Sequence, residues 1–402
     1  MMEYVTLDLR PETPFVHLYP DPDWPLRPSE VKGLWRWWAR ALVAGALFEQ
    51  GLLHGTGGRD ALKTPTRGET DCISRIVGLD MGLGYADKRE RESQASCFRI
   101  RFEEVNFAPP RDVSQSLAHR FQLLKQLVRD DGYCRYRDYS PHYIDGGSAT
   151  LVIDEHIPCS LDNKAVEAAL GALALALRLS CFGWGGRRGL GCFSVKAYGR
   201  YSSLFTEEPK TLIRRVVAAV SGVVNRAVSR CRGLRRAAEP PKCALPPTPA
   251  VSIMRRYDAC AKDSAVITPY MLVTVKGVRP EDLHNFFAQS QNRAGATAYD
   301  VRDAAVQTLK SMMIFAEGAK RPPPMMLAFS GKTAYLSVFT SADWPRELER
   351  KQWPRIVVIA EMDILTATAL ALREFIGYVK KLGGTVEVWP SQPTAQDYSD
   401  IF

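Results

Sequence analysis

The sequence lacks the local patterns that mark several common classes of protein. Its nine cysteines are odd in number, form no Cys-x-x-Cys pair, and lie in several cases within apolar or strand-like segments. A reduced, buried thiol is the usual state of such residues, so we expect neither a disulfide framework nor a zinc site. The sequence also contains no G-x-x-x-x-G-K-[ST] loop for a nucleoside triphosphate. We therefore expect no cofactor.

Long apolar runs are missing as well. The most apolar run, 168–177, has about ten residues, whereas a helix needs ~20 to cross a bilayer. The first residues carry neither the basic segment nor the apolar core of a signal peptide. We expect a cytoplasmic protein with no membrane partner.

Basic residues are abundant. The 402 residues include 53 lysines and arginines against 44 acidic residues, which gives a net charge of +9, and 37 of the 53 are arginine. Arginine binds phosphate through a planar fork and stacks on flat rings, so this bias favours contact with nucleic acid. A high-arginine genome or a thermophilic lifestyle would produce the same bias. A chain of this length is expected to form two or three domains.

A tryptophan-rich helix is predicted at about 29–50. Three of the eight tryptophans fall within four residues there, and Lys32, Arg36 and Arg40 recur at intervals of four. At helical spacing these cations share one face. Ser29 is expected to cap the helix. The opposite, core-facing stripe comprises Val31, Leu34, Trp38, Leu42 and Gly45.

Strand and helix patterns alternate in an order that repeats along the chain. Strands are predicted at 3–9, 96–107, 149–157 and 192–198, and helices at 29–50, 114–129 and 162–180. Apart from the helix at 114–129 and a stretch at 52–95 without clear period, this is the β-α-β, β-α-β order of a ferredoxin-like domain. A second set has strands at 266–277, 325–330, 334–339 and 386–389 and helices from 280 and at 363–382, with an added helix (299–312) and an added strand (355–360).

The predicted fold class is therefore α+β, with two ferredoxin-like (βαββαβ, RRM-like) domains and helical insertions. We place the N-terminal domain at 1–205, a basic helix (about 211–231) and proline-rich connection at 206–250, and the C-terminal domain at 251–402. Two alternatives remain for the basic segment 210–242, whose nine cations accompany only Glu239: it faces RNA, or it faces a neighbouring subunit. Sheets of this kind commonly bind RNA, although the fold alone does not prove it.

A glycine-rich loop with two central arginines joins the predicted helix 162–180 to the strand at 192. Five glycines fall in nine positions around Arg187 and Arg188. Glycine lets the backbone approach a ligand, successive amides form an anion-binding nest, and arginines add charge-assisted contacts to phosphate. A dinucleotide site is excluded because the loop runs from helix to strand. The alternative is a turn that only reverses the chain.

These two stretches carry a resemblance to a known family. Arg-Pro-Ser-Glu-Val-Lys-Gly-Leu-Trp-Arg-Trp-Trp-Ala-Arg-Ala resembles the S-x-K-G-x-x-R-W-W-x-R opening of the RAMP (repeat-associated mysterious protein) superfamily, and Gly-Trp-Gly-Gly-Arg-Arg-Gly-Leu-Gly is similar to its G-G-x-x-R-x-G-x-G loop. The tryptophan helix is most similar to the head subunit of the type III-B (Cmr) CRISPR effector complex. The match covers roughly residues 1–200, and the loop departs from relatives in which Gly-Leu-Gly precedes a longer Ser/Arg run.

The resemblance implies an antiviral defence function: a non-catalytic subunit that binds the guide RNA near its 3′ end and helps to capture single-stranded target RNA, beside other RAMP subunits. The RNA-binding residues that it implies are Lys32, Arg36, Trp37, Arg40, Gly185, Gly186, Arg187, Arg188, Gly189 and Gly191. We expect Trp35 and Trp38 to pack in the core, and Trp37 lies on the border between the two faces.

Two alternatives to this function stay open. The first is a RAMP-type endoribonuclease that processes precursor CRISPR RNA, with His17 or another of the six dispersed histidines as the base. The second is a scaffold whose basic face binds an acidic protein. We assign no catalytic residue and no metal ligand.

Overall fold

The computed structural model describes most of the chain. The predicted helices at 114–129 and 299–312, and Trp184, Cys134, Cys243 and Cys260, lie outside the described residues. The residues that the structure describes are 2–17, 26–57, 63–87, 92–112, 142–183, 185–236, 245–253, 268–288, 315–316, 319–320, 325–343, 349–352, 355–358 and 364–390.

The first sheet is antiparallel and has the strand order β11-β1-β10-β7. By chain position this order is 4-1-3-2. Helix α1 (Pro28–Glu49) follows the first strand, and α4 (Asn163–Leu179) joins the third to the fourth. The strands and helices predicted for this half at described residues are confirmed. The strands are β1 (Glu3–Pro11), β7 (Phe98–Phe107), β10 (Gly147–Glu155) and β11 (Phe193–Tyr198).

The second sheet repeats this connectivity. Its antiparallel order is β15-β16-β12-β19, which by chain position is 2-3-1-4, the same order read from the other edge. Helix α7 (Pro280–Ala288) follows its first strand, and α9 (Ile364–Lys381) precedes its last. The strands are β12 (Tyr270–Lys276), β15 (Met325–Ser330), β16 (Thr333–Phe339) and β19 (Thr385–Trp389).

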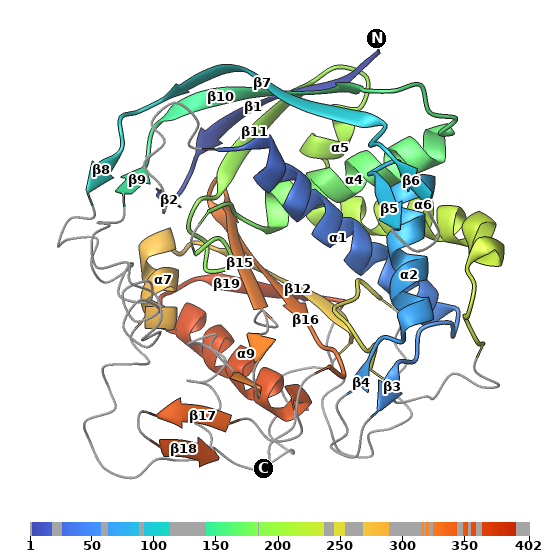
Figure 1. Cartoon of the computed structure of the whole chain (residues 1–402). Helices are drawn as coiled ribbons and strands as arrows, with labels where there is room; N and C mark the ends of the chain where they lie inside the picture. Colours follow the sequence, from blue (N-terminus) through green and yellow to red (C-terminus); the bar gives the residue numbers. More distant parts are fainter. Residues whose placement is uncertain are drawn as a thin grey trace.

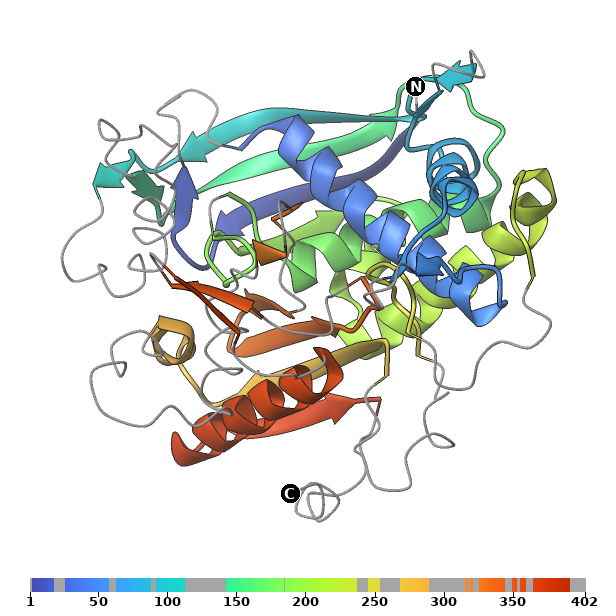
Figure 2. The ribbon, with the colours of Figure 1, turned by 60° about the horizontal axis from the view of Figure 1, so that its bottom comes forward.

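The two sheets stack with helices between them and beyond them. Figure 2 shows the first sheet at the top, then α1, α4 and α6 (Pro209–Ala227), then the second sheet, with α9 below it. Helix α4 contacts both β11 and β15, so it touches both sheets. Among the described residues, no helix covers the face of the first sheet that points away from α1 and α4 (Figure 1).

The side chains of β12 alternate between two helical layers, which pack on opposite faces of the second sheet. Tyr270 and Leu272 join the large core that contains Trp35 and Trp38, whereas Met271 and the other alternate residues join a separate cluster with α7 and α9. Successive side chains of a strand point to opposite faces, so a strand buried on both faces is apolar throughout. This accounts for the unbroken apolar run Tyr-Met-Leu-Val of β12.

Two close backbone approaches hold the helical layer together. A Cβ on Gly171 of α4 would lie 2.3 Å from Val216 Cγ2 of α6, and one on Gly45 of α1 would lie 2.0 Å from the carbonyl oxygen of Val251. Only glycine permits such contacts.

The prediction that Ser29 caps α1 is wrong, because the helix starts at Pro28 and Arg27 is its N-cap. Proline suits the first helical position, where no amide donor is needed.

The stretch 52–95 is more regular than the sequence indicated. It contains α2 (Arg67–Arg75), a π-helical turn η1 (Ile76–Asp80) and two short hairpins. The buried Glu69 carboxylate organises it by accepting hydrogen bonds from the amides of His54 (2.5 Å), Gly55 (3.1 Å) and Thr66 (2.6 Å). The stretch has no long amphipathic run, and contacts of this kind leave no periodic signal in the sequence. Its helices and hairpins were therefore not predicted.

Shorter elements complete the described structure. The predicted strand at 355–360 is confirmed at 355–358, although it forms a hairpin outside the second sheet. The remaining elements are β2 (Phe15–His17), β3 (Thr56–Gly57), β4 (Lys63–Thr64), β5 (Tyr85–Asp87), β6 (Glu92–Gln94), β8 (Arg111–Asp112), β9 (His142–Ile144), α5 (Ser203–Thr206), η3 (Val228–Arg230), β13 (Phe315–Ala316), β14 (Ala319–Lys320), β17 (Glu349–Gln352) and β18 (Arg355–Val358).

The expectation that no disulfides form is wrong. Six cysteines make three bridges, whose partners are 159, 62 and 11 residues apart in the sequence. Local spacing gives no sign of such pairs, because tertiary packing alone brings the sulfur atoms together. Several of these cysteines are buried, as expected, but they are paired rather than reduced. The bridges are Cys72–Cys231, Cys97–Cys159 and Cys181–Cys192.

Among the described residues, no helix is both long and apolar enough to span a membrane.

Candidate functional site

The three tryptophans of α1 all take part in packing. Trp35 and Trp38 are fully buried, as predicted. The Trp35 indole N–H donates to the carbonyl oxygen of Ala169 (2.6 Å), and that of Trp38 donates to Ser180 Oγ (2.7 Å). Trp37 is half-buried and packs edge-on against Trp38 and Phe339, with ring centroids 5.6 and 5.2 Å apart. The tryptophans therefore attach α1 to α4 on one side and to the second sheet on the other.

Two of the helix cations hold the insertion that follows it. Arg36 donates to the carbonyl oxygen of Gly84 (2.5 Å), and Arg40 donates to Ser74 Oγ (2.7 Å). Burial, and then repulsion from Arg36, lowers the pKa of both Lys32 and Arg40. The cationic stripe thus lies beside α2 and η1, where part of its hydrogen-bonding capacity is used within the chain.

The glycine loop is closed at its base. The disulfide Cys181–Cys192 joins its two ends, and the amide of Phe182 donates to the carbonyl oxygen of Gly191 (2.9 Å). Inside the loop, the amides of Gly186 and Arg188 donate to the carbonyl oxygens of Gly183 and Gly185. These two amides serve the turn and are not available to cradle an anion.

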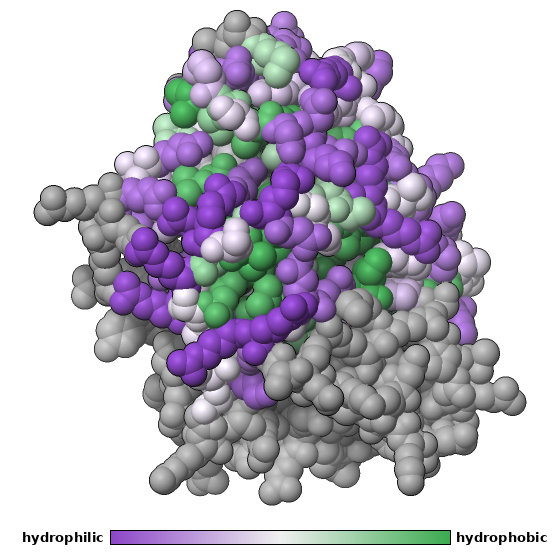
Figure 3. Space-filling view, turned by 90° about the vertical axis from the view of Figure 1, so that its right-hand side faces the viewer, coloured by the Kyte–Doolittle hydropathy of each residue, from purple (hydrophilic) through white to green (hydrophobic). Residues whose placement is uncertain are grey.

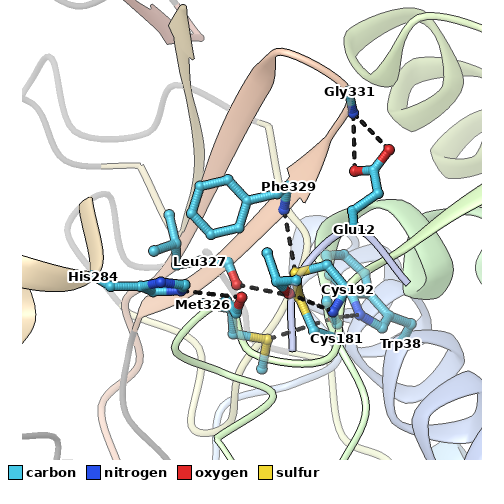
Figure 4. Close-up of a disulfide and its surroundings, with 12 residues drawn as sticks. Glu12, Trp38, Cys181, Cys192, His284, Met326, Leu327, Phe329 and Gly331 are labelled. Atoms are coloured by element: carbon cyan, nitrogen blue, oxygen red, sulfur yellow. Dashed lines mark hydrogen bonds between the residues drawn. A yellow bond between two sulfur atoms is a disulfide. The ribbon is translucent and has the colours of Figure 1, made fainter. Parts of the chain in front are cut away.

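The loop docks on the edge of the second sheet. The amide of Leu327 in β15 donates to the carbonyl oxygen of Arg187 (2.9 Å), and Arg188 forms a parallel bridge with Leu327. Figure 4 shows the disulfide beside β15, with the amide of Phe329 hydrogen-bonded to Cys192 Sγ at 3.4 Å. The loop therefore extends the second sheet while its ends belong to the first half of the chain.

The glycines make this docking possible. At Gly189 (φ 79°) a Cβ would lie 2.4 Å from the Phe329 ring, and at Gly191 (φ 75°) one would lie 2.1 Å from the carbonyl oxygen of Phe182. Gly185 has a φ of 86°, and a Cβ on Gly186 would lie 2.3 Å from the carbonyl oxygen of Cys181. These four glycines are explained by close packing and positive φ.

The two arginines of the loop differ in exposure. Arg188 is 8% exposed, whereas Arg187 is half-buried and its guanidinium lies 5.9 Å from the centre of the Trp37 ring. Burial lowers the pKa of each to about 10, so both remain charged at neutral pH. The structure thus brings Trp37 and Arg187 together, and it separates them from Arg36 and Arg40, which face the insertion.

Sequence reasoning missed two residues outside the loop, one that holds the loop and one that holds the turn between β15 and β16. The buried His284 of α7 has Nε2 3.1 Å from the carbonyl oxygen of Gly189, and its ring packs edge-on against Phe329. At the end of β1, the carboxylate of Glu12 accepts the amide of Gly331 at 2.8 and 2.9 Å. Burial raises the pKa of Glu12. Neither residue belongs to a local motif, so no sequence signal singled them out.

The histidine favoured as a catalytic base lies on a strand next to the loop. His17 ends β2 and pairs in register with His142 of β9. A Cβ on Gly183 would lie 2.6 Å from the Val16 carbonyl oxygen, which puts the backbone of β2 against the loop. Within the described residues, no group of three or more His, Cys, Asp or Glu side chains is arranged to hold a metal ion.

Several cations of the basic segment make contacts within the protein itself. On α6, Lys210 pairs with Glu387, and Arg215 pairs with Glu167. Arg214 lies over the ring of Trp389 at 5.4 Å. These contacts hold α6 against α4 and the second sheet. The positive charges of these three residues are therefore engaged by groups of the same chain.

The open face of the first sheet carries charges of both signs. Asp154 accepts hydrogen bonds from Arg99 and Arg101, each at 2.8 Å. Tyr198 is 43% exposed, with Lys196 Nζ 5.3 Å from its ring. Sheets that stack RNA bases present several aromatic rings, which this described face does not.

Comparison with known proteins finds structural relatives only. No family model matches the chain, and no curated protein matches its sequence. The fold is similar to that of Cmr1 from Pyrococcus furiosus in its apo form, at 14% identity and a TM-score of 0.49 over 95% of this chain and 98% of that one.

Two further similar chains come from the type III-B Cmr-beta complex. One is in the complex bound to cognate target RNA (14% identity, TM-score 0.47, 94% of this chain and 100% of that one). The other is in the complex bound to cognate target RNA and AMPPnP, state 2, in the presence of ssDNA (11% identity, TM-score 0.50, 94% and 100%). The resemblance to the type III-B branch is thus confirmed at the level of the fold.

Proposed function

We propose that this chain is a RAMP subunit of a type III-B CRISPR effector complex that binds RNA and does not cleave it. Two sequence motifs and a shared fold support this proposal. The fold likeness extends over 94% of this chain and all of a chain from the RNA-bound Cmr-beta complex. The two motifs meet in space, because Trp37 of the helix lies against Arg187 of the loop.

Each sheet with its two helices is, in this proposal, a ferredoxin-like unit. The strand orders 4-1-3-2 and 2-3-1-4, with a helix after the first strand and another before the fourth, support this reading. The insertion around α2 and the hairpin β17–β18 are additions to this plan.

The observation that carries RNA binding is the charge balance at Arg187. Among the described residues no carboxylate forms an ion pair with Arg187, in contrast to Lys210, Arg215 and Arg230 of the basic segment. A partly buried charge without a counter-charge is costly, and an anion from another molecule removes that cost. A phosphate of RNA matches the planar donor fork of arginine.

The chain's role then follows from this contact. Arg187 holds the RNA backbone at the junction of the two sheets, and the glycines and the disulfide fix the loop that carries it. Backbone contacts position an RNA with little regard to its sequence, which suits a subunit that must accept any guide or target. Its partners are the guide RNA near its 3′ end, single-stranded target RNA and other RAMP subunits.

The test is a salt titration of RNA binding by the assembled complex carrying Arg187→Ala. We expect weaker binding and a plot of log affinity against log salt whose slope falls by about 0.7, which is the loss of one phosphate contact on a single strand. Arg10→Ala, which removes an exposed cation from the open face of the first sheet, is the matched control and should leave the slope unchanged. An unaltered slope in the Arg187 variant would remove the basis for this contact.

Two further assays separate the alternatives. Metal-free incubation of the purified chain with a repeat-containing transcript should leave the RNA intact, and cleavage at one site would favour the endoribonuclease, with His17 as the first residue to replace.

Treatment of the isolated complex with RNase should loosen the subunit from its partners if RNA holds it. Retention at full strength would favour the scaffold.

A further inference from the structure

A polar pocket lies at the far end of α6 from the second sheet, and it plays no part in the proposed RNA contact. It has a volume of about 600 Å³ and is bordered by η1, β6, residues 157–162 and the last turns of α6. Figure 3 faces the side of the molecule on which β6 and α6 lie, where hydrophilic residues surround apolar ones. A volume of this size is typical of small-molecule sites.

Three arginines from three helical segments converge on this pocket. Arg75 comes from α2, Arg226 from the last turn of α6 and Arg230 from η3, which follows α6 directly. All three act electrostatically on the carboxylate of Asp80, whose side chain is only 15% exposed. Each arginine also pairs with a carboxylate at the pocket: Arg75 with Glu92, Arg226 with Asp162 and Arg230 with Asp80.

The arginines are paired, but their donors are not exhausted. Arg226 holds Asp162 through one terminal nitrogen at 2.8 Å, and Arg230 holds Asp80 likewise through one terminal nitrogen. A guanidinium carries five N–H donors in a fork, so each of these two retains donors for a second acceptor. Asp162 is exposed, which leaves its pairing with Arg226 screened by water.

Asp80 occupies the position that an anionic ligand would take. Burial raises the pKa of Asp80 although three arginines oppose that shift, so its charged form is only partly compensated there. A phosphate group offers three oxygens to the remaining donors of Arg226 and Arg230, and it replaces one carboxylate with a stronger set of charge-assisted hydrogen bonds. Without a bound phosphate, the carboxylate of Asp80 takes the place of that phosphate beside the arginines.

The rest of the pocket fits a flat apolar group. Leu79, Leu161 and Val223 contribute apolar side chains to its wall, and the space exceeds what a phosphate alone would fill. We propose that this pocket binds a nucleoside phosphate, with the base on these apolar side chains and the phosphate on Arg226 and Arg230, next to the ion pair of Arg75 with Glu92. This site does not depend on the RNA contact of the glycine loop.

The experiment is calorimetric titration of the full chain with adenosine 5′-monophosphate, adenosine and inorganic phosphate. We expect saturable binding of the monophosphate, at least about tenfold tighter than either part alone. The double variant Arg226→Ala with Arg230→Ala should lose about tenfold or more in affinity, and Asp80→Asn should gain affinity because it removes the competing carboxylate. Arg214→Ala, on the same helix but outside the pocket, should bind as the unaltered chain does.

Several results would overturn the proposal. They are no saturable binding by either the unaltered chain or Asp80→Asn, unchanged affinity in the double arginine variant, or tighter binding of a hexaglutamate peptide than of the monophosphate. A pair of RNA oligonucleotides with and without a 5′-phosphate identifies the source of the ligand. Preference for the phosphorylated strand assigns the pocket to an RNA end, and binding of the monophosphate alone assigns it to a free nucleotide.

Discussion

In this protein, side chains that are close in the sequence make different tertiary contacts. Trp35, Trp37 and Trp38 lie within four residues, yet Trp35 packs on the first sheet at Phe98 and Trp38 packs on Tyr270 of the second. Trp37 lies under the guanidinium of Arg187. Trp37 and Trp38 both pack on Phe339 of the second sheet, whereas Trp35, almost one turn earlier, reaches the first sheet.

A charged triplet on the open sheet face gives a prediction at the scale of one residue. Hydrogen bonds from Arg99, and then from Arg101, hold the pKa of Asp154 below its usual range. Its stabilising effect is therefore present above the unfolded-state pKa of about 3.9 and is lost as pH falls through the lower, folded-state value. Asp154→Asn should lower the free energy of unfolding at pH 7 by about 0.5–1 kcal/mol, once solvent screening is allowed for.

Urea unfolding at pH 7 and at pH 2.5 measures this effect. The unaltered protein should lose more stability between the two values than Asp154→Asn does. Glu104→Gln, at an exposed position on β7, the strand of Arg99 and Arg101, is the control and should behave as the unaltered protein. Parallel losses in all three proteins would contradict the assignment.

At the scale of elements, the α2 insertion is fastened to the end of α6. Cys72 of α2 is bridged to Cys231, and the His54 ring lies 3.1 Å from the carbonyl oxygen of Arg235. The disulfide spans 159 residues, and closing so long a loop restricts the unfolded chain strongly. Replacing both cysteines with alanine should therefore lower the free energy of unfolding by about 2–5 kcal/mol.

Denaturant unfolding with and without a reducing agent checks this expectation. Reduction should destabilise the unaltered protein by a larger amount than it destabilises the double alanine variant. Mass spectrometry of the non-reduced digest should contain a cross-linked peptide that joins Cys72 to Cys231. Detection of both thiols as free in the native protein would contradict the bridge.

For the whole molecule, the layers share one core. Residues of the second sheet, among them Tyr270 and Phe339, belong to the same apolar cluster as α1, α4 and α6. Separating the two sheets would expose that helical layer to water, at a cost proportional to the apolar area uncovered. The predicted boundaries at 205 and 250 stay predictions, but the packing argues against independent folding of the two halves.

A single cooperative unfolding transition is the expected consequence. Tryptophan fluorescence and far-ultraviolet circular dichroism should give the same midpoint in urea, because both halves lose structure together. The fragment 1–205 by itself should lack the near-ultraviolet signal of the packed tryptophans. Two separate transitions, or a fragment with native-like cooperative unfolding, would refute this view of the core.

The sequence by itself determined the strands of the two sheets, the helices α1, α4, α7 and α9, and their order. Alternation in β1 and the apolar stripe of α1 are set by the periodicity of strand and helix, so short windows of sequence were sufficient to predict them. The glycine loop and the tryptophan helix were also identifiable, because each is a compact motif. The role of their residues was not, since Arg36 and Arg187 are equally basic in the sequence and only packing distinguishes them.

Tertiary structure alone decided which distant groups meet. The three disulfides, the contact of His284 with Gly189 and the pairing of Arg230 with Asp80 join residues 11 to 159 positions apart, and nothing in a local window encodes such distances. Chain folding fixes them through the stacking of two sheets on a shared helical layer. For that reason the sequence predicted a basic surface, whereas the structure determined which of its charges are neutralised inside the chain and left Arg187 without a carboxylate partner among the described residues.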